Sequence, residues 1–232
     1  MKVFISWSRS IKKLNNLVWK KIDEYINKSS IFLIWDAIWV DELVQRYLVK
    51  KWYFNVEIYT AEIKPRILES EKFKVINFYI ENKKWRQKQK IKDIKMTELA
   101  DVLLVIWDWE SRWSYENILR WLKLWKKVEV FFNGKFLENV FYEQIKEIFY
   151  ENHKFSISEY IKEFKIKLTT KEIRKLLEDY YILKWDKILI KEWVVIEKNR
   201  YWKSVFRFDK KILDEVCKSK LYQYNQNSFL GM

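Results

Sequence analysis

The sequence predicts an α/β protein: a doubly wound, Rossmann-like parallel sheet followed by a small C-terminal α+β module that resembles a winged helix. Three observations predict this class. Short apolar runs recur between residues 2 and 132, and segments with apolar residues at helical spacing separate them. Polar turns follow the runs, as they do where a parallel strand is followed by a helix. After Asn133-Gly134 the pattern changes to short helices and then to apolar, strand-like runs.

The first 132 residues contain five predicted strands. Each is a short, mostly apolar run, which is typical of strands buried on both faces of a parallel sheet. The segment after Pro65 is less regular and receives no element. Met96, Leu99 and Ala100 are expected to face inward from a helix that ends near residue 100. The strands are predicted at 2–6, 31–34, 55–59, 102–107 and 127–132, with helices at 11–26, 40–48, 86–100 and 114–125 between them.

The C-terminal part begins with one predicted amphipathic helix at 138–150. Two shorter helices follow, and the second of them starts with Thr169 and Glu172 at the spacing of a capping box. Three apolar runs then predict hairpin-forming strands, and helices followed by a hairpin are typical of a winged-helix domain. We therefore expect a Rossmann-like nucleotide-binding domain over 1–135, a helix and linker over 136–155, and a winged-helix-like module over 156–232.

The composition is unusual in two residue types. Average usage would give roughly 16 glycines in a chain of this length, but the chain has 2 glycines and 14 tryptophans. Several tryptophans occupy positions where a turn normally uses glycine. Trp7 and Trp35 follow predicted strands, and Trp52 and Trp125 follow predicted helices.

We therefore hypothesise that most of these tryptophans are glycines in the cell. A UGA codon is read as glycine in some genetic codes and as tryptophan in others, so one gene gives either sequence. Trp107 and Trp19 lie in apolar interiors of predicted elements and are the expected exceptions. Trp185, Trp193 and Trp202 stand at turn-like positions of the β-rich segment and belong to the hypothesis.

The turns after the predicted strands resemble those of a known family once glycine is substituted at the tryptophan positions. The motifs are Ser6-Trp7-Ser8-Arg9, Ile34-Trp35-Asp36-Ala37, Lys92-Asp93, and the turn from Asp108 to Asn117. With them, residues 1–132 resemble the YspA-like branch of the SLOG superfamily. That Rossmann-like group also contains the Lonely-Guy phosphoribohydrolases and the DNA-processing protein DprA. A literal Trp113 departs from the pattern, because an indole there would block the approach of a phosphate.

The resemblance implies a binding site for a nucleotide or a nucleotide derivative. It favours a ligand-binding sensor over an enzyme. Ligands of open α/β sheets bind at the carboxyl ends of the strands, where a helix N-terminus attracts phosphate. Asp36 and Asp41 are expected to accept hydrogen bonds from a ribose or base, although Asp36 equally fits a helix cap. No cofactor is firmly implied beyond the nucleotide ligand. The predicted ligand-binding residues are Ser6, Trp7, Ser8, Arg9, Trp35, Asp36, Asp41, Asp108, Trp109, Ser111, Arg112, Trp113, Ser114 and Asn117.

An enzymatic alternative is a phosphoribohydrolase that cleaves the N-glycosidic bond of a nucleoside monophosphate. Glu116 is the candidate for its catalytic carboxylate, because it follows the phosphate-binding turn. The complete glycine-rich pattern of those enzymes is absent, so a solvent-facing helix residue is the competing interpretation. His153 is the sole histidine, which excludes a His-based triad or zinc site. Cys217 is expected to be a small buried residue.

A second alternative is a DprA-like protein that binds nucleic acid. The net charge of +14 favours anionic partners, and in a winged helix one helix enters the major groove while the hairpin contacts the backbone. A solvated, lysine-rich face is the competing interpretation. The candidate phosphate contacts are Lys171, Arg174 and Lys175 on the predicted helix and Lys198, Arg200, Lys203 and Arg207 on the hairpin.

The cellular context is predicted from three absences in the sequence. A single cysteine excludes an internal disulfide, no apolar run approaches 18 residues, and the chain starts with a strand instead of a signal-peptide pattern. We therefore expect a cytoplasmic protein without membrane contact. Its expected partner is a nucleotide-like small molecule, and a homodimer is the assembly that we consider.

Overall fold

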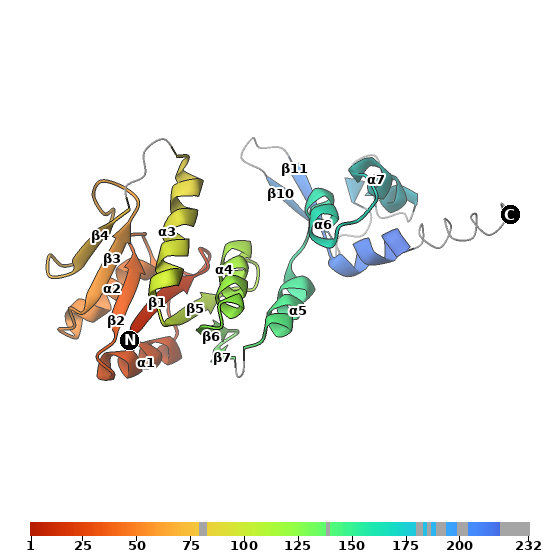
Figure 1. Ribbon diagram of the computed structural model, residues 1–232. Coiled ribbons are helices and arrows are strands. Elements are labelled where there is room, and N and C mark those ends of the chain that lie inside the picture. Colours follow the sequence, from red (N-terminus) through yellow and green to blue (C-terminus); the bar gives the residue numbers. More distant parts are fainter. Residues whose placement is uncertain are drawn as a thin grey trace. The chain divides into compact units, whose positions relative to one another are not determined.

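The computed structural model describes residues 1–78, 83–137, 140–179, 183–184, 187–188, 194–198 and 204–218. The chain divides into two compact units, Met1–Lys146 and Glu147–Met232. The division falls within helix α5 (Tyr142–Asn152), and the predicted domain limits at 135 and 156 lie on either side of it. Figure 1 shows the elements of each unit.

Unit 1 is built on a seven-stranded sheet with the order β4-β3-β2-β1-β5-β6-β7. All neighbouring strands are parallel except β6 and β7, which form a hairpin closed by Asn133-Gly134. This sheet confirms the predicted Rossmann-like α/β class. The strands are β1 (Lys2–Trp7), β2 (Ile31–Trp35), β3 (Val56–Thr60), β4 (Lys74–Asn77), β5 (Val102–Trp107), β6 (Lys127–Phe132) and β7 (Lys135–Phe136).

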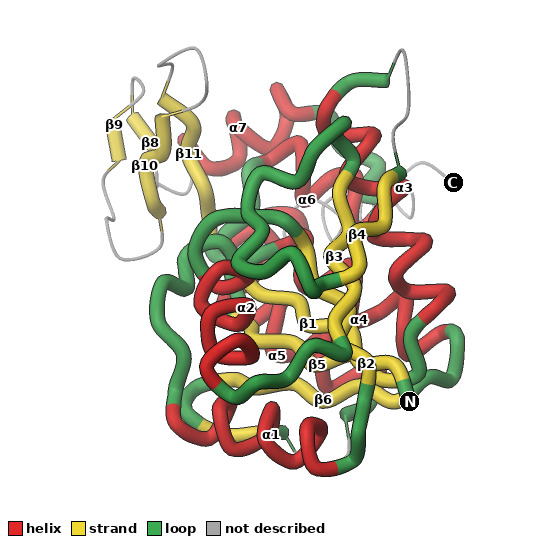
Figure 2. The backbone as a smooth tube through the Cα atoms, turned by 90° about the vertical axis from the view of Figure 1, so that its left-hand side faces the viewer, coloured by secondary structure: helices red, strands yellow, loops and turns green. Residues whose placement is uncertain are grey.

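Two layers of helices enclose the sheet (Figure 2). Helices α1 (Asn16–Asn27) and α2 (Val40–Lys50) bury their apolar residues in one cluster with Val3 and Ile5 of β1. Successive strand side chains point to opposite faces, and Phe4 meets the ring of Trp121 at 6.1 Å on the other side. Trp121 belongs to α4 (Arg112–Lys123), which shares that layer with α3 (Trp85–Leu99).

The structure differs from the sequence prediction in four elements of unit 1. Helix α1 begins at Asn16, after its cap Asn15, and not at residue 11. Strands β4 and β7 were not predicted. Leu99 is 44% exposed, so its predicted inward orientation was wrong, whereas Met96 and Ala100 are buried as predicted. The reason is that α3 buries a largely polar face, which includes Gln89, Lys92, Asp93 and Thr97.

Helices α2 and α4 end in the same hydrogen-bond pattern. After α2, the Trp52 N–H donates to the Val49 carbonyl and the Tyr53 N–H donates to the Leu48 carbonyl, both at 2.9 Å. This pair of bonds is a Schellman motif, which requires a left-handed residue after the helix. After α4 the left-handed residue is Trp125, with φ of 55°. Glycine adopts this backbone conformation without strain, whereas a residue with a Cβ atom is strained in it.

Left-handed backbone is concentrated at tryptophan in this chain. Among the described residues, seven non-glycine residues have positive φ, and four of them are Trp39, Trp52, Trp109 and Trp125. Trp39 precedes α2 with φ of 82° and ψ of −109°, a region that glycine populates and other residues avoid. Trp52 is 79% exposed and Trp125 is 96% exposed, so packing of these two indoles does little to offset the backbone strain.

Unit 2 combines short helices with a hairpin. Helix α6 (Ile157–Phe164) starts with a capping box of Ser156 and Glu159. Helix α7 (Thr170–Asp179) starts with the capping box of Thr169 and Glu172 that the sequence predicts. The described strands are β8 (Leu183–Lys184), β9 (Lys187–Ile188), β10 (Val194–Lys198) and β11 (Ser204–Phe208); β8 pairs with β9 and β10 with β11, both antiparallel. The winged-helix interpretation of these elements stays a prediction.

A last described helix covers residues 210–218 and carries Cys217, which is 3% exposed. Burial raises the pKa of its thiol to about 11, which disfavours the reactive thiolate. The prediction of a small buried cysteine is confirmed. Within the part of the chain that the structure describes, no helix has the length and apolar character needed to cross a membrane.

Candidate functional site

Unit 1 contains a cleft of about 910 Å³ at the carboxyl ends of its central strands. The residues that follow β1, β2, β3 and β5 line it, together with the start of α3. A cleft of this size accommodates a small-molecule ligand. Its position is the crevice in which open α/β sheets bind ligands.

Six of the predicted ligand-binding residues line this cleft. They come from the ends of three adjacent strands, β2, β1 and β5, and from the start of α4, which explains why distant motifs converge. Arg9 contributes a cation, Ser111 a hydroxyl and Asp108 a carboxylate. The six residues are Trp7, Arg9, Trp35, Asp108, Ser111 and Trp113.

The other eight predicted residues lie outside the cleft wall. Six of them are buried, so they do not face a ligand. Trp109 instead packs its ring against Phe132, with 5.5 Å between ring centroids. Arg112 pairs with Glu116 at 3.1 Å on the surface of α4. The buried ones are Ser6, Ser8, Asp36, Asp41, Ser114 and Asn117.

Ser8 joins the loop after β1 to the loop after β5. Its hydroxyl accepts a hydrogen bond from the Asp108 N–H at 3.1 Å and lies 3.2 Å from the Ser114 hydroxyl. Its own N–H donates to the Ile106 carbonyl at 2.9 Å. Ser8 is fully buried, so it does not face a phosphate as the sequence predicts. It positions the start of α4 instead.

The start of α4 is capped by the chain itself. Ser111 is the N-cap, and its hydroxyl accepts from the Ser114 N–H at 3.3 Å. The Ser111 N–H donates to Asp108 Oδ1 at 2.8 Å, and the Ser10 hydroxyl donates to the other carboxylate oxygen. Two of the N–H groups that a helix N-terminus would offer to a phosphate are thus already engaged.

Asp36 is the centre of a buried charge cluster at the ends of β2 and β3. Its carboxylate accepts from Arg66 Nη2 at 2.9 Å and from the Thr60 hydroxyl at 2.8 Å, and Lys92 Nζ lies 3.4 Å away. Burial alone would raise the pKa of Asp36, but hydrogen bonds from Arg66 and the charge of Lys92 outweigh it and lower the pKa to about 2. Asp36 is therefore ionised, and it is too enclosed to accept from a ribose.

Asp41 and Lys92 are the other fully buried charges near this cluster. Asp41 accepts from the Ala37 N–H at 3.0 Å through one oxygen, and its Oδ1 has no hydrogen-bond partner in the structure. Burial raises the pKa of Asp41, so its neutral form is favoured. Lys92 Nζ lies 4.6 Å from the centre of the Trp35 ring. The Trp35 indole therefore stands between this ammonium and the cleft.

Sequence analysis missed several residues that line the cleft. Arg66 is the most informative, because Asp36 holds its guanidinium at the wall while 36% of its side chain stays exposed. Arg66 directly follows Pro65, in the segment that received no predicted element. The available signal was that this segment leaves the carboxyl end of β3. The other missed lining residues are Ser10, Lys12, Ala37, Ile38, Trp39, Lys84, Gln89 and Glu110.

Among the described residues of the two alternative functions, none belongs to the wall of this cleft. Glu116 is on the exposed side of α4, where it pairs with Arg112. In unit 2, Lys171 and Lys175 are exposed on α7, and Arg174 lies 3.6 Å from Glu178. Arg207 contacts Glu159 at 2.6 Å. Arg200 and Lys203 lie outside the described residues, as does the side chain of Lys198.

No cluster of three or more metal-ligating side chains occurs among the residues that the structure describes. Compared with known proteins, the chain matches no family model, no curated protein and no solved structure. The candidate site is thus defined by its own geometry: a cleft at the carboxyl edge of a parallel sheet, with cations, indoles and one self-capped helix start.

Proposed function

We propose that unit 1 binds a nucleotide or a nucleotide derivative and acts as a ligand-binding sensor. The observation that carries the proposal is the composition of the cleft. Arg9, Lys12, Arg66 and Lys84 supply positive charge, while flat indole faces line the same wall. Cations suit phosphate, and aromatic faces suit the stacking of a base.

The backbone supports a second part of the proposal, that several tryptophans are glycines in the cell. Trp39, Trp52, Trp109 and Trp125 hold positive φ, which glycine accepts and a large side chain resists. Of these, Trp39 also lines the cleft, beside Trp7, Trp35 and Trp113. Glycine at the cleft positions would widen it and bring backbone N–H groups within reach of a phosphate.

Binding is tested on the full chain by calorimetry with adenosine, AMP, ADP and NAD. Two forms are compared, one with the printed sequence and one with glycine at positions 7, 35, 39, 52, 109, 113 and 125. Saturable binding of a phosphorylated compound to the glycine form, tighter than that of adenosine, is the expected result. If no nucleotide binds either form, the proposed function is wrong.

The same samples separate a sensor from a phosphoribohydrolase. Each nucleoside monophosphate is incubated with the protein, and free base is measured by chromatography. We expect no release above the background rate, because Glu116 is paired with Arg112 outside the cleft. Release at catalytic turnover would replace the sensor with the enzyme.

The glycine proposal has its own test, which needs no ligand. The intact mass of the protein isolated from its native cell is expected to fall below that of the printed sequence by a whole multiple of the tryptophan-to-glycine difference. A mass that matches all 14 tryptophans would reject this part of the proposal and leave the binding proposal standing.

A further inference from the structure

The charges along the cleft are unequally distributed. At the end that β2 and β3 form, Arg66 lines the wall and Lys92 lies behind Trp35. Arg9 and Lys12 follow β1, in the middle of the cleft. At the other end, the residues that follow β5 contribute two carboxylates, Asp108 and Glu110. A ligand with a phosphate at one end and N–H donors at the other would therefore bind in one preferred direction.

The Arg66 end is built for an anion. A guanidinium has five N–H donors, and Asp36 engages it through Nη2 at 2.9 Å and Nε at 3.4 Å. The same carboxylate is 3.4 Å from Lys92 Nζ, so one ionised carboxylate faces two cations. Asp41, buried nearby, favours its neutral form because of its burial. The Asp36 carboxylate thus holds the Arg66 guanidinium in place at the cleft wall, where 36% of the Arg66 side chain stays exposed.

The α4 end is unsuited to an anion. Two of its N-terminal N–H groups, those of Ser111 and Ser114, are occupied by Asp108 and Ser111. A phosphate placed there would also approach the carboxylates of Asp108 and Glu110. The N–H groups of a base, by contrast, donate hydrogen bonds to carboxylates readily. From β3 across β2 and β1 to β5 there are three strand spacings, or about 14 Å, which is close to the length of an extended mononucleotide from phosphate to base.

We propose that the anionic group of the ligand binds at Arg66, at the ends of β2 and β3, and that the N–H donors of its base face Asp108 and Glu110. This inference rests on the proposed nucleotide binding. It reverses the usual arrangement of Rossmann-like sites, in which the phosphate lies at a helix N-terminus and an acidic residue after β2 holds the ribose. Here that acidic residue, Asp36, is 1% exposed and is bound to Arg66.

The test compares AMP with adenosine on the full chain and on Arg66→Gln. We expect the affinity for AMP to fall about ten- to hundredfold, because a charge-assisted hydrogen bond is lost, while adenosine binds unchanged. Arg46→Gln is the matched control: it removes the same charge from an exposed side chain that pairs with Glu42 and Glu69 outside the cleft. It should leave both affinities unchanged.

Two further variants keep the inference falsifiable if Arg66→Gln unfolds. Arg66→Lys retains the charge and is expected to lose less affinity for AMP than Arg66→Gln, or to bind it within a few-fold of the unaltered chain. Glu110→Gln is expected to weaken AMP and adenosine alike by a few-fold, since a phosphate about 14 Å away is screened at physiological salt.

The outcomes separate the two proposals. If AMP binds the unaltered chain but Arg66→Gln and Arg66→Lys both leave its affinity unchanged, the orientation is wrong. The same conclusion follows if Glu110→Gln tightens AMP alone, because that result places the phosphate beside Glu110. If neither compound binds the unaltered chain, the nucleotide proposal itself fails and the orientation falls with it.

Discussion

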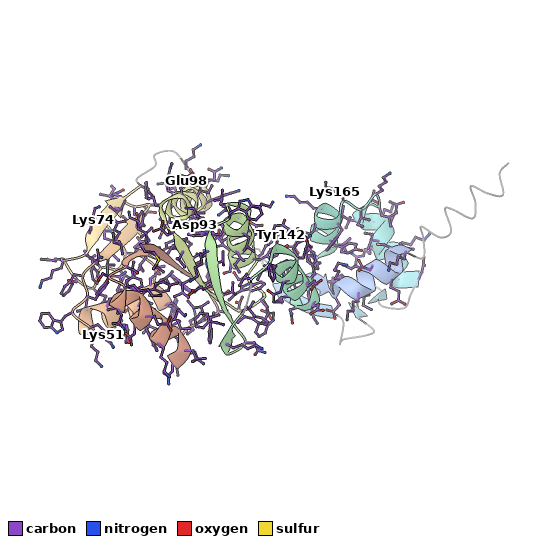
Figure 3. The ribbon with its side chains drawn as sticks, turned by 60° about the horizontal axis from the view of Figure 1, so that its bottom comes forward. Lys51, Lys74, Asp93, Glu98, Tyr142 and Lys165 are labelled. Carbon is purple, nitrogen blue, oxygen red and sulfur yellow. The ribbon has the colours of Figure 1, made fainter. Side chains whose placement is uncertain are left out.

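Asp93 is a fully buried carboxyl on α3. It lies on the side of α3 that faces α4, where Asn117 Nδ2 donates to its Oδ2 at 3.4 Å and its Oδ1 has no hydrogen-bond partner (Figure 3). Burial raises its pKa to about 7, against the opposing effect of the nearby Lys92. A carboxyl whose folded pKa exceeds its ordinary 3.8 holds a proton that the unfolded chain releases. Its contribution to stability is therefore complete below pH 3.8 and is lost as the pH rises toward 7.

Asp93→Asn removes this titration while keeping an oxygen that accepts from Asn117. We expect the variant to gain stability relative to the unaltered chain between pH 4 and pH 8, by up to about 4 kcal/mol. Urea unfolding at several pH values measures it. Glu98→Gln, on the exposed side of the same helix (Figure 3), should show no such trend, and a parallel trend in both variants would contradict the assignment to Asp93.

Trp125 and Trp121 are four residues apart and differ in what their indoles do. Trp125 is 96% exposed with positive φ, whereas Trp121 is fully buried and donates to the Thr97 hydroxyl at 3.0 Å. Trp125→Gly is therefore expected to stabilise the chain by about 1 kcal/mol. Trp121→Gly is expected to destabilise it by at least about 3 kcal/mol. Thermal unfolding measures both, and a loss of stability in Trp125→Gly would contradict the strain argument.

At the scale of elements, the end of α3 depends on Lys126, which lies in the loop between α4 and β6. Lys126 Nζ donates to the carbonyls of Thr97, Glu98 and Ala100 at 2.8, 2.8 and 2.7 Å. The last carbonyls of a helix lack partners within it and carry partial negative charge, so an ammonium stabilises them. This side chain therefore links the end of α4 to the end of α3.

Lys126→Met keeps most of the aliphatic chain and removes the three hydrogen bonds. We expect the free energy of unfolding to fall by about 1 to 3 kcal/mol, with faster amide hydrogen exchange at the C-terminal turn of α3. Lys127→Met is the control, because Lys127 is an exposed residue whose charge pairs with Glu129 at the surface. Equal effects of the two substitutions would show that charge, and not the cap, matters.

Elements with a continuous apolar pattern could be predicted from the sequence. Strand β5 is buried at every position, and its apolar run gives it the clearest signal. Strand β4 lies at the sheet edge with three exposed residues of four, and it has only two apolar residues, Val75 and Ile76. Its apolar run is therefore too short to predict a buried strand. The inner face of α3 could not be predicted from apolar spacing either. Its buried positions include the charged residues Lys92 and Asp93, which a hydrophobic pattern predicts to be exposed to solvent.

The candidate site was predictable at strand ends and not beyond them. Ligands of open α/β sheets bind at the carboxyl ends of the strands, and this predicted Arg9, Asp108 and Ser111 at one edge of the sheet. The structure has all three in the cleft wall. Arg66 could not be found, because it depends on a loop that folds back onto Asp36, 30 residues away. Which polar residues face the ligand and which hold the loops is decided by burial, and sequence spacing does not give burial.

At the scale of the molecule, unit 1 contains a complete sheet, its core and the whole cleft. We expect residues 1–146 to fold without unit 2 and to unfold cooperatively, with the AMP affinity of the full chain. Circular dichroism and calorimetry on the fragment check this. A fragment that shows helical signal but no cooperative transition would mean that unit 2 is needed for the fold of unit 1.

The two edges of the sheet, β4 and β7, also bear on how copies of the chain meet. As described, β4 has four residues and β7 has two, and each begins with a lysine, Lys74 or Lys135. Short, charged edge strands offer a poor template for pairing with another chain. A chain with 49% hydrophobic residues thus keeps its parallel sheet from extending into aggregates. A homodimer of this protein would accordingly form through a surface other than strand pairing.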